Sequence, residues 1–282
     1  MKGVNLVVLV SILILTKNRL DLTKRCIESV LKHTPEPFEF VFVDNDSDDG
    51  TPDYLRSLNF GKVIRNKINR GFAGGINQGL REVSGDYILL LNNDTVVTPH
   101  WLGKLLACIE RDPNIGVAGP MSYHVAPIQR VSDGGPDGLE ELDEYAERRG
   151  IQYAGKGFYG HKLTGFCMLI SSDVVKRIGG FDERFFPGNY EDDDFCIRAR
   201  IGGYRLWAAE DVYVHHEGHG TFKVLSEDYR TLSLQNAERF REKWNVGRSA
   251  YEIDVFGYNP SDVVERETFF DPARYFIALK DG

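Results

Sequence analysis

The sequence predicts an α/β protein whose central sheet is mostly parallel and is flanked by helices. Over roughly the first hundred residues, short runs that are apolar at every position alternate with segments of helical periodicity. Such runs are typical of strands buried on both faces, and their alternation with helices predicts parallel strands joined by right-handed crossovers. The length of 282 residues allows one large α/β domain or two small ones.

Four strands are predicted in this first part of the chain. They comprise Leu6 to Leu15, Phe38 to Val43, Lys62 to Arg65, and a run from Tyr87 that ends in Asn92, Asn93 and Asp94. The segments between them show helical spacing, and the first helix is expected from about Leu22 to Lys32 because two prolines follow it.

The rest of the chain combines regular elements with one long irregular stretch. Residues 123–160 show no clear period, and they predict a surface excursion of the kind that is often functional. The expected strands are Ile115 to Ala118, Leu163 to Ile170, Tyr204 to Trp207 and Asp211 to His215, and the expected helices are Trp101 to Ile109, Asp173 to Ile178, Glu191 to Gly202 and Leu225 to Trp244.

Composition argues against some classes of function. The net charge is −8, whereas a non-specific nucleic-acid binder needs a basic face. The four cysteines lie far apart without C-x-x-C spacing, so we expect buried, reduced thiols and a cytoplasmic protein. The apolar run from Val4 to Leu15 is too short to span a bilayer, so membrane contact is expected only as a peripheral contact at the inner face or through a partner.

Four loops are expected to meet at one edge of the sheet, because they follow parallel strands. They lie at Thr16 to Arg19, at Asp44, at Asn69 to Gly75, and at Asn92 to Asp94. Open α/β sheets bind ligands at the carboxyl ends of their strands. We therefore expect Asp94 to hold a divalent cation that grips a nucleotide diphosphate. The alternative is an ordinary strand-to-loop exit, since Asn and Asp are common in turns.

Two of these loops suit a nucleotide. Asp44 sits where a carboxylate can accept a hydrogen bond from a base N–H, whereas the aspartates that follow it are interpreted as a solvated turn. The glycines between positions 71 and 75 permit close backbone approach before a helix whose free N–H groups suit an anion, or else they form a strained turn alone. This segment has neither a G-x-G-x-x-G nor a P-loop pattern.

Two further clusters carry titratable groups. Glu191 to Asp194 places four carboxylates in the first turn of a helix, where dipole complementarity is worth about 0.3–1 kcal/mol per charge. Because adjacent like charges repel, a functional role is favoured for some of them, such as a general base toward a hydroxyl. His215, His216 and His219 predict one metal ligand among them, the alternative being a set of surface histidines.

Together these segments resemble the family 2 glycosyltransferases of the GT-A fold, over about residues 8–222. The matching motifs are Thr16-x-Asn18-Arg19, Val43-Asp44-Asn45-x-Ser47-x-Asp49-Gly50-Thr51, Asn69-x-Gly71-Phe72-Ala73-x-Gly75-x-Asn77-x-Gly79, Leu91-Asn92-Asn93-Asp94, Gly179-Gly180-Phe181-Asp182-Glu183, Glu191-Asp192-x-Asp194 with Arg198, and His216 with Thr221. The resemblance is to the non-processive, rhamnosyltransferase-like subgroup. It implies a Rossmann-like GT-A domain at 1–222, with a nucleotide-binding half at 1–100 and an acceptor half at 101–222, and a small helical and irregular C-terminal extension at 223–282.

The resemblance also implies roles for particular residues. Asp192, in the pair with Glu191, matches the catalytic base. Asp94 matches the metal ligand for Mn²⁺ or Mg²⁺, and His216 completes that site, with His215 as the alternative. The residues implied in nucleotide binding are Thr16, Asn18, Arg19, Asp44, Asn69, Gly75, Asn77 and Asn92.

Two departures from the family pattern qualify these roles. The D-x-D position reads Asn92-Asn93-Asp94, so a single carboxylate is left for the metal, which predicts weaker binding assisted by the diphosphate of the substrate. The Q-x-x-R-W of processive relatives is absent, which argues against a polymerising synthase.

The implied reaction is inverting, metal-dependent sugar transfer from a UDP- or dTDP-linked donor to a hydroxyl of a glycan, lipid-linked or other acceptor, in surface polysaccharide or glycoconjugate synthesis. A sugar nucleotidyltransferase is the first alternative, but it needs a basic, glycine-rich loop where Thr16 to Arg19 stands. A catalytically silent sugar-nucleotide-binding module is the second, and the intact Glu191-Asp192 pair argues against it.

Overall fold

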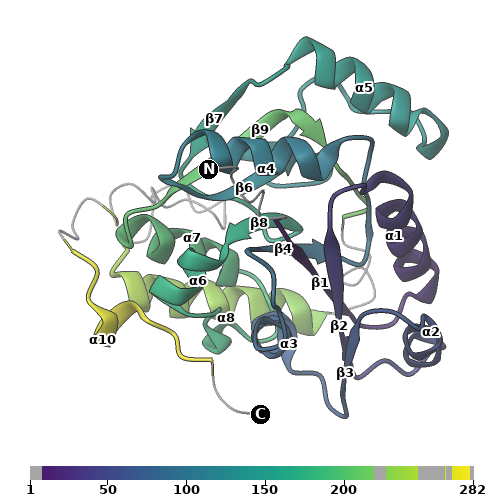
Figure 1. Cartoon of the computed structure of the whole chain (residues 1–282). Helices are drawn as coiled ribbons and strands as arrows, with labels where there is room; N and C mark the ends of the chain where they lie inside the picture. The colour runs from purple at the N-terminus through teal and green to yellow at the C-terminus, as the bar shows by residue number, and fades with distance from the viewer. Residues whose placement is uncertain (1–7, 219–226, 247–263, 265–268, 280–282) are drawn as a thin grey trace, which may run out of the picture.

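The computed structural model describes residues 8–218, 227–246, 264 and 269–279, and it contains one eight-stranded sheet with helices on both faces (Figure 1). The strands of this sheet are β1 (Val10–Thr16), β2 (Phe38–Asn45), β3 (Lys62–Asn66), β4 (Tyr87–Asn92), β6 (Ile115–Met121), β7 (Gly157–Gly160), β8 (Cys167–Ser171) and β9 (Arg205–Tyr213). Across the sheet they follow the order β3-β2-β1-β4-β8-β6-β9-β7. The predicted α/β class with a mostly parallel sheet is confirmed.

The first four strands pair in parallel, so their carboxyl ends lie at one edge. In β1, Thr16 is paired with Asp44 of β2, and Leu15 is paired with Asn92 of β4. The end of β2 is paired in turn with the end of β3. The predicted convergence of the loops that follow these strands is therefore confirmed by the register of the sheet.

Two strands run against the others. Strand β8 lies between β4 and β6 and is antiparallel to both, and β7 is antiparallel to β9 at the far edge. A continuous apolar run reports burial on both faces but not strand direction, so the sequence predicted β8 without its orientation. Its amino end, which follows Gly165 and Phe166, lies at the edge where β4 ends, since Cys167 pairs with Leu91.

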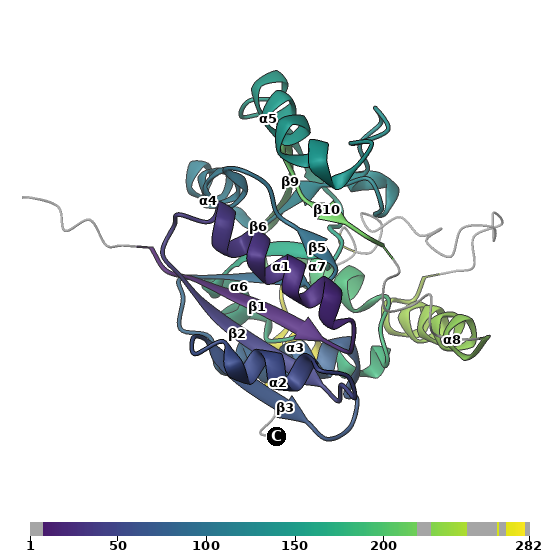
Figure 2. The ribbon, with the colours of Figure 1, turned by 90° about the vertical axis from the view of Figure 1, so that its right-hand side faces the viewer.

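Alternate side chains of each strand enter two separate cores. Ile12 and Ile14 of β1 pack with α1 (Leu20–His33), α2 (Thr51–Ser57) and α4 (Trp101–Arg111), whereas Leu13 packs on the opposite face. Figure 2 shows α1 and α2 lying over β1 and β2. The helices of the other face are α3 (Gly71–Leu80), α6 (Ser172–Ile178), α7 (Glu191–Ile201) and α8 (Glu227–Trp244).

The 123–160 stretch corrects the sequence prediction, because it is folded rather than irregular. It holds helix α5 (Leu142–Gln152) and strand β7, preceded by single 3-10 turns at Pro127–Gln129 and Leu139–Glu141. Leu142, Tyr145 and Ala146 of α5 are buried in the core of the second face. Their spacing is helical, but it covers one turn within a charged segment, which leaves too little periodicity to detect.

The segment after α7 also differs from prediction. Residues 205–213 form the single strand β9 rather than two short strands, with irregular pairing to β6 near Tyr213. A small separate sheet follows, in which β10 (His215–His216) pairs with β5 (Thr95–Val96). His219 and Thr221 lie outside the described residues.

The C-terminal part packs onto the domain. Helix α8 contributes Ala237, Phe240 and Trp244 to the core of the second face, and the short helix α10 (Pro272–Tyr275) contributes Tyr275. All four cysteines are buried and free, as predicted. Within the described ranges no helix combines the length and the apolar character needed to cross a membrane.

Candidate active site

The carboxyl edge of β1, β2 and β4 gathers the residues predicted to bind a nucleotide. Thr16 Oγ1 lies 3.4 Å from Asp44 Oδ1 and donates to it. The loop after β1 is tied to the loop after β2, since the backbone N–H of Asn18 donates to Ser47 Oγ at 2.7 Å. It is tied to the end of β4 as well, because Asn93 Nδ2 donates to the carbonyl of Asn18 at 3.4 Å.

Asp44 is a buried carboxylate with unused hydrogen-bonding capacity. Its side chain is fully buried, and its Oδ2 atom accepts no hydrogen bond from any described residue. The Nε of Arg65 lies 3.8 Å away. Burial raises the pKa of Asp44 above its ordinary value, against the hydrogen bonds from Ser47. A buried acceptor without a donor is costly, so this atom suits an N–H supplied by a ligand.

Arg19 and Asn18 both adopt left-handed backbone conformations in the loop after β1. Asn18 Oδ1 accepts from the backbone N–H of Asp48 at 2.8 Å, so its side chain holds the neighbouring loop. The pKa of Arg19 is raised, chiefly by its hydrogen bond to Asp21 and in smaller part by the charge of Asp94. The guanidinium of Arg19 is paired with Asp21, at 3.1 Å.

Asp94 and His216 face each other at the candidate metal position. His216 Nε2 lies 3.2 Å from Asp94 Oδ1, and the short β10–β5 pairing sets this approach. His216 Nδ1 donates to the carbonyl of His124 at 2.8 Å, and the ring stacks on Phe166 with centroids 5.0 Å apart. This bond fixes the tautomer, so in neutral His216 the Nε2 lone pair points toward Asp94, as a metal ligand requires.

These two side chains fit part of a divalent metal shell. Asn92 Nδ2 lies 3.5 Å from His216 Nε2, so the amide is adjacent. Across the described part of the chain, no group of three or more His, Cys, Asp or Glu side chains is arranged to hold a metal. A cation here needs further oxygen ligands from substrate or water, as the Asn92-Asn93-Asp94 sequence predicts. The His215 ring lies 3.8 Å from Glu217 instead, which favours His216 of the two.

Helix α3 shows which protein groups are contacted by two of the residues predicted to bind the nucleotide. A Cβ at Gly75 would lie 2.4 Å from Cδ1 of Leu15, so this glycine lets α3 approach β1 and faces the sheet. Asn77 is buried, donates to the Phe181 carbonyl at 2.8 Å and to Glu183, and accepts from the Phe181 N–H at 2.7 Å. Both residues serve packing against protein. The sequence pattern could not distinguish a backbone close to a ligand from a helix close to a strand.

Asn69 and Gly71 shape the start of α3. Asn69 Oδ1 accepts from Asn45 Nδ2 and from the Gly71 N–H, both at 2.8 Å. Gly71 has a φ of +70°, and a Cβ there would meet Phe186 at 2.7 Å and the carbonyl oxygen of Pro187 at 3.0 Å. The N–H of Phe72 donates to that same carbonyl at 2.8 Å. The glycine therefore joins α3 to the loop before α7.

We expect Gly71→Ala to lower the free energy of unfolding by more than Gly155→Ala does. Gly155 has a similar φ of +66° but nothing within 4 Å of its Cβ position, so its cost is that of the left-handed backbone alone, about 1–2 kcal/mol. The further loss of unfolding free energy in Gly71→Ala, beyond that in Gly155→Ala, measures the cost of the contact with Phe186 and Pro187. Urea denaturation of the two variants gives the comparison, and equal losses would contradict it.

The four carboxylates at the start of α7 divide into distinct environments. Asp194 is fully buried and is paired with Arg198 at 2.8 Å, and Asp193 is paired with Lys162 at 2.9 Å. Glu191 is buried, and its Oε2 finds no hydrogen-bond partner among the described residues. Asp192 alone of the four keeps part of its surface exposed. The repulsion expected from the sequence is thus relieved by buried cations at two positions.

Asp192 has the position and the electrostatics of a general base. Its two oxygens accept from the backbone N–H groups of Gly165 and Asp193, both at 2.9 Å. Burial, together with the charge of Asp193, raises the pKa of Asp192 to about 6. A carboxylate of that pKa is ionised at neutral pH and takes up a proton more readily than an ordinary aspartate.

Asp192 and Asp94 flank the same short segment. The Gly165 N–H binds Asp192, and the carbonyl of Phe166 accepts from the N–H of Asn92 at 2.8 Å. A Cβ at Gly165 would also lie 3.5 Å from Cζ of Phe72, at the start of α3. The predicted base, the predicted metal ligand and the glycine-rich loop therefore meet around Gly165 and Phe166.

Sequence reasoning missed four residues that build this site, namely His124, Lys162, Gly165 and Phe166. His124 and His216 each direct ring Nδ1 to the backbone carbonyl of the other, at 3.1 and 2.8 Å. No local pattern marks such a residue, because His124 is 92 positions from its partner. Gly165 and Phe166 do stand directly before the apolar run of β8, and knowing the direction of that strand would have placed them at the ligand edge.

The parallel sheet edge places these loops and Asp94 where open α/β folds bind ligands. The sequence model of Glycosyl transferase family 2 matches residues 11–179, and the chain belongs to that family. Asp192 and His216 lie beyond the matched range, so their roles rest on the geometry and on the resemblance.

Three proteins are similar to this chain in sequence or in fold. The uncharacterised protein y4gI of Sinorhizobium fredii is 24% identical over 96% of this chain and 31% of its own length. The O-antigen biosynthesis protein RfbC of Myxococcus xanthus is 27% identical over 74% of this chain and 17% of its own. The chain thus spans less than a third of either relative. The crystal structure of GalNAc-T7 with UDP, GalNAc and Mn²⁺ matches 98% of this chain and 56% of that one, at 17% identity and a TM-score of 0.65, which shows the shared fold.

Proposed function

We propose that the protein transfers a sugar from a UDP- or dTDP-linked donor to a hydroxyl of a glycan or lipid-linked acceptor, with inversion at the anomeric carbon. The observation that carries this proposal is that Asp94 and Asp192 lie near the same short segment, Gly165 and Phe166, one on each side of it. The unpaired Oδ2 of buried Asp44 supports a donor whose base presents an N–H, as uracil and thymine do.

The proposed chemistry is a single displacement. Asp192 accepts the proton of the acceptor hydroxyl while that oxygen forms a bond to the anomeric carbon. The bond from the anomeric carbon to the diphosphate oxygen breaks, and its electron pair leaves with the nucleoside diphosphate. Attack opposite the leaving group inverts the anomeric configuration. Gly165 and Asp193 hold the carboxylate of Asp192 in place through their N–H groups.

Asp94 and His216, with Asn92 beside them, would hold Mn²⁺ or Mg²⁺. The bound cation would supply Lewis-acid neutralisation of the leaving diphosphate. Arg19, in the loop after β1, would add a second positive charge for the diphosphate.

We further propose that the protein is a non-processive, rhamnosyltransferase-like member of its family that acts in surface polysaccharide or glycoconjugate synthesis. The missing Q-x-x-R-W motif supports single transfers. The similarity to RfbC, named for O-antigen biosynthesis, supports a surface polymer. A cytoplasmic location, with peripheral contact at the inner face of the membrane for a lipid-linked acceptor, follows from this assignment.

A donor panel tests the proposal. We expect UDP-glucose, UDP-galactose, UDP-N-acetylhexosamines or dTDP-rhamnose, with Mn²⁺, to raise the melting temperature and to be slowly hydrolysed, and GDP-mannose to do neither. Proton NMR of the first sugar released should show the anomer opposite to that of the donor. Binding without hydrolysis would indicate a silent binding module, and retention of configuration would exclude the single displacement.

Replacing Asp94 by Asn should remove the effect of Mn²⁺ on UDP binding. Loss of even an outer-shell partner lowers metal affinity by about 10–100-fold, so the loss of the carboxylate proposed to ligate the metal should cost at least roughly as much. Calorimetric titration of UDP with and without MnCl₂ measures the effect. Asp46→Asn, in the exposed turn after β2, is the matched control, and an equal response of the two variants would contradict the assignment.

A further inference from the structure

Helix α8 lies against the loop that leads into the catalytic helix α7. Its buried face carries Asn236, Ala237, Phe240, Lys243 and Trp244. The ring of Phe240 lies 5.2 Å from that of Tyr190, which immediately precedes α7. The base Asp192 is only two residues further along. The packing of α8 is therefore directed at the turn from which the base projects.

Asn236 holds the backbone of this loop. Its fully buried Nδ2 lies 2.9 Å from the carbonyl of Phe185, 3.2 Å from that of Phe186 and 2.9 Å from that of Gly188. Arg239 donates to the carbonyl of Arg184 at 2.9 Å. After the 3-10 turn Glu183–Phe185, the amide of Asn236 thus satisfies the carbonyls of Phe185 and Gly188, which would otherwise be buried unpaired.

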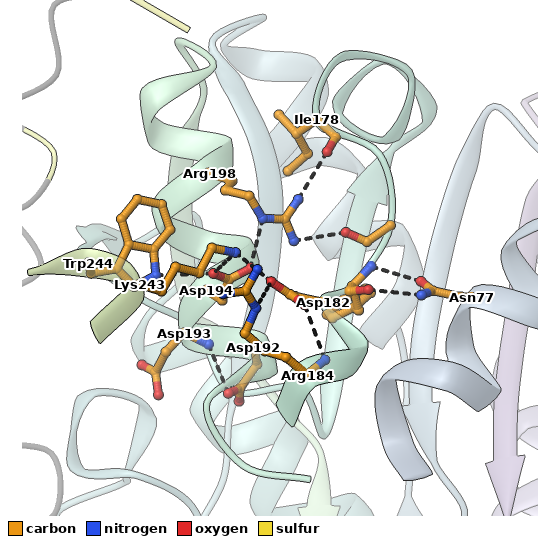
Figure 3. A network of polar contacts seen from close by, with 12 residues as sticks. Asn77, Ile178, Asp182, Arg184, Asp192, Asp193, Asp194, Arg198, Lys243 and Trp244 are labelled. Carbon is orange, nitrogen blue, oxygen red and sulfur yellow. Dashed lines mark hydrogen bonds and ion pairs between the residues drawn. The ribbon is translucent and has the colours of Figure 1, made fainter. Parts of the chain in front are cut away.

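Lys243 joins the two acidic positions on either side of this loop (Figure 3). Its Nζ lies 2.8 Å from Asp182 Oδ2 and 2.5 Å from Asp194 Oδ1, and all three side chains are buried. Burial alone would raise the pKa of Asp182, but the charge of Lys243 and its hydrogen bond outweigh that effect and lower it. Trp244 Nε1 donates to the same Asp194 oxygen at 3.0 Å.

The contacts that Asn236 and Lys243 make with this loop and its two ends, which we call the clamp, lie on both sides of the base Asp192 in the sequence. Asp182 precedes the loop, Asp194 follows Asp192 in the first turn of α7, and one ammonium group of α8 fixes the separation of the two. The same loop also contacts the start of α3, beside the proposed nucleotide-sugar site, because the Pro187 carbonyl accepts a hydrogen bond from the N–H of Phe72. A shift of α8 would thus move the base relative to the carboxyl edge of β1, β2 and β4, where we propose that the nucleotide binds.

We infer that Lys243 and Asn236 are positioning residues for Asp192, and that α8 is a working part of the active site although it lies outside the matched range of the family. This inference rests on the proposed function. Misplacing a reacting group by about 1 Å can cost roughly 10²-fold in rate, so loss of the clamp should lower turnover far more than donor binding.

Kinetics of substituted proteins test the inference. We expect Lys243→Met and Asn236→Leu each to lower kcat for nucleotide-sugar turnover by about 10²-fold, with the Kd for UDP and Mn²⁺ within about twofold of wild type. Lys243→Arg should recover most of the activity, because it restores a cation between the two carboxylates. The matched controls on α8, half-buried Arg241→Met and exposed Gln235→Leu, should leave both quantities unchanged.

Hydrogen exchange supplies a second readout that does not depend on turnover. In Lys243→Met and Asn236→Leu, amides of residues 183–194 should exchange about tenfold faster or more, while those of β1 and β4 keep their protection. Normal kcat below the melting temperature, or unchanged exchange in 183–194, would overturn the inference. A wild-type protein that turns over none of the donors would count against the proposed function, and the exchange result would still decide the role of α8.

Discussion

Replacing Asp192 by Asn is expected to lower sugar transfer by at least about 10³-fold while leaving UDP binding intact. General base catalysis alone contributes about 10²–10⁴-fold, and an amide of the same shape cannot accept the proton. Isothermal titration of UDP with Mn²⁺ and an assay of UDP release from the active donor give the two quantities. Asp193→Asn is the informative neighbour, because Asp193 is buried against Lys162 and should not take the proton itself.

The pH dependence of the wild type adds an independent check on this residue. Because the pKa of Asp192 is raised to about 6, the base is ionised above that pH and becomes protonated below it. In kcat/KM profiles, which report the ionisations of the free enzyme, the value should therefore be constant at pH 7–8 and fall tenfold per pH unit well below about pH 6. An acid limb near pH 4, or an active Asp192→Asn variant, would show that another group takes the proton.

Replacing Arg198 by Met should cause the largest loss of stability. The guanidinium is fully buried and donates to Asp194 at 2.8 Å, to the Ile178 carbonyl at 3.0 Å and to the Gly180 carbonyl at 2.8 Å. Removing one partner of a buried ion pair typically costs about 3–5 kcal/mol, and here Lys243 still neutralises part of Asp194, so we expect about 3 kcal/mol.

Urea denaturation monitored by circular dichroism measures that loss. The matched control is Lys176→Met, which removes an exposed i,i+3 ion pair with Asp173 and should change the free energy of unfolding by no more than about 0.5 kcal/mol. Arg198→Lys keeps a charge near Asp194 but loses the fork to the two carbonyls, so it should fall between wild type and the Met variant. Equal stability of the Met variant and the control would contradict the structural role.

The carboxyl edge of β1, β2 and β4, where we propose that the nucleotide binds, could be predicted from sequence because each strand end is marked by a local pattern. A buried parallel strand followed at once by a polar residue places that residue at the ligand edge, and this reasoning located Thr16, Asp44 and Asp94 from strand ends alone. The roles of the four carboxylates could not be separated in that way. Asp194 pairs with Arg198 one turn along the same helix, but the other cations that decide which carboxylate is paired, Lys162 and Lys243, come from segments distant in sequence.

Packing, which a sequence pattern does not report, explains the contacts of Gly75 and Asn77 and the helix α5 that the sequence analysis missed. Gly75 and Asn77 match a nucleotide-binding motif, but their surroundings are Leu15 and Phe181, so the same small or amide side chain serves close packing. Helix α5 packs against β9, and this packing stabilises the helix more than the short helical pattern in its own sequence does. Strand direction, long-range packing and hydrogen bonds to distant carbonyls are properties of the assembled fold, and they determine both cases.

The segment before the reversed strand β8 links the two ends of the proposed site. Residues 162–166 are held at one end by the ion pair of Lys162 with Asp193, and at the other by the hydrogen bond from the Asn92 N–H to the Phe166 carbonyl. If Asp94 and Asp192 act as proposed, an insertion or deletion of even one residue in this segment would change the separation of the metal ligand and the base. We therefore expect changes of length to be tolerated less here than on the surface around α5.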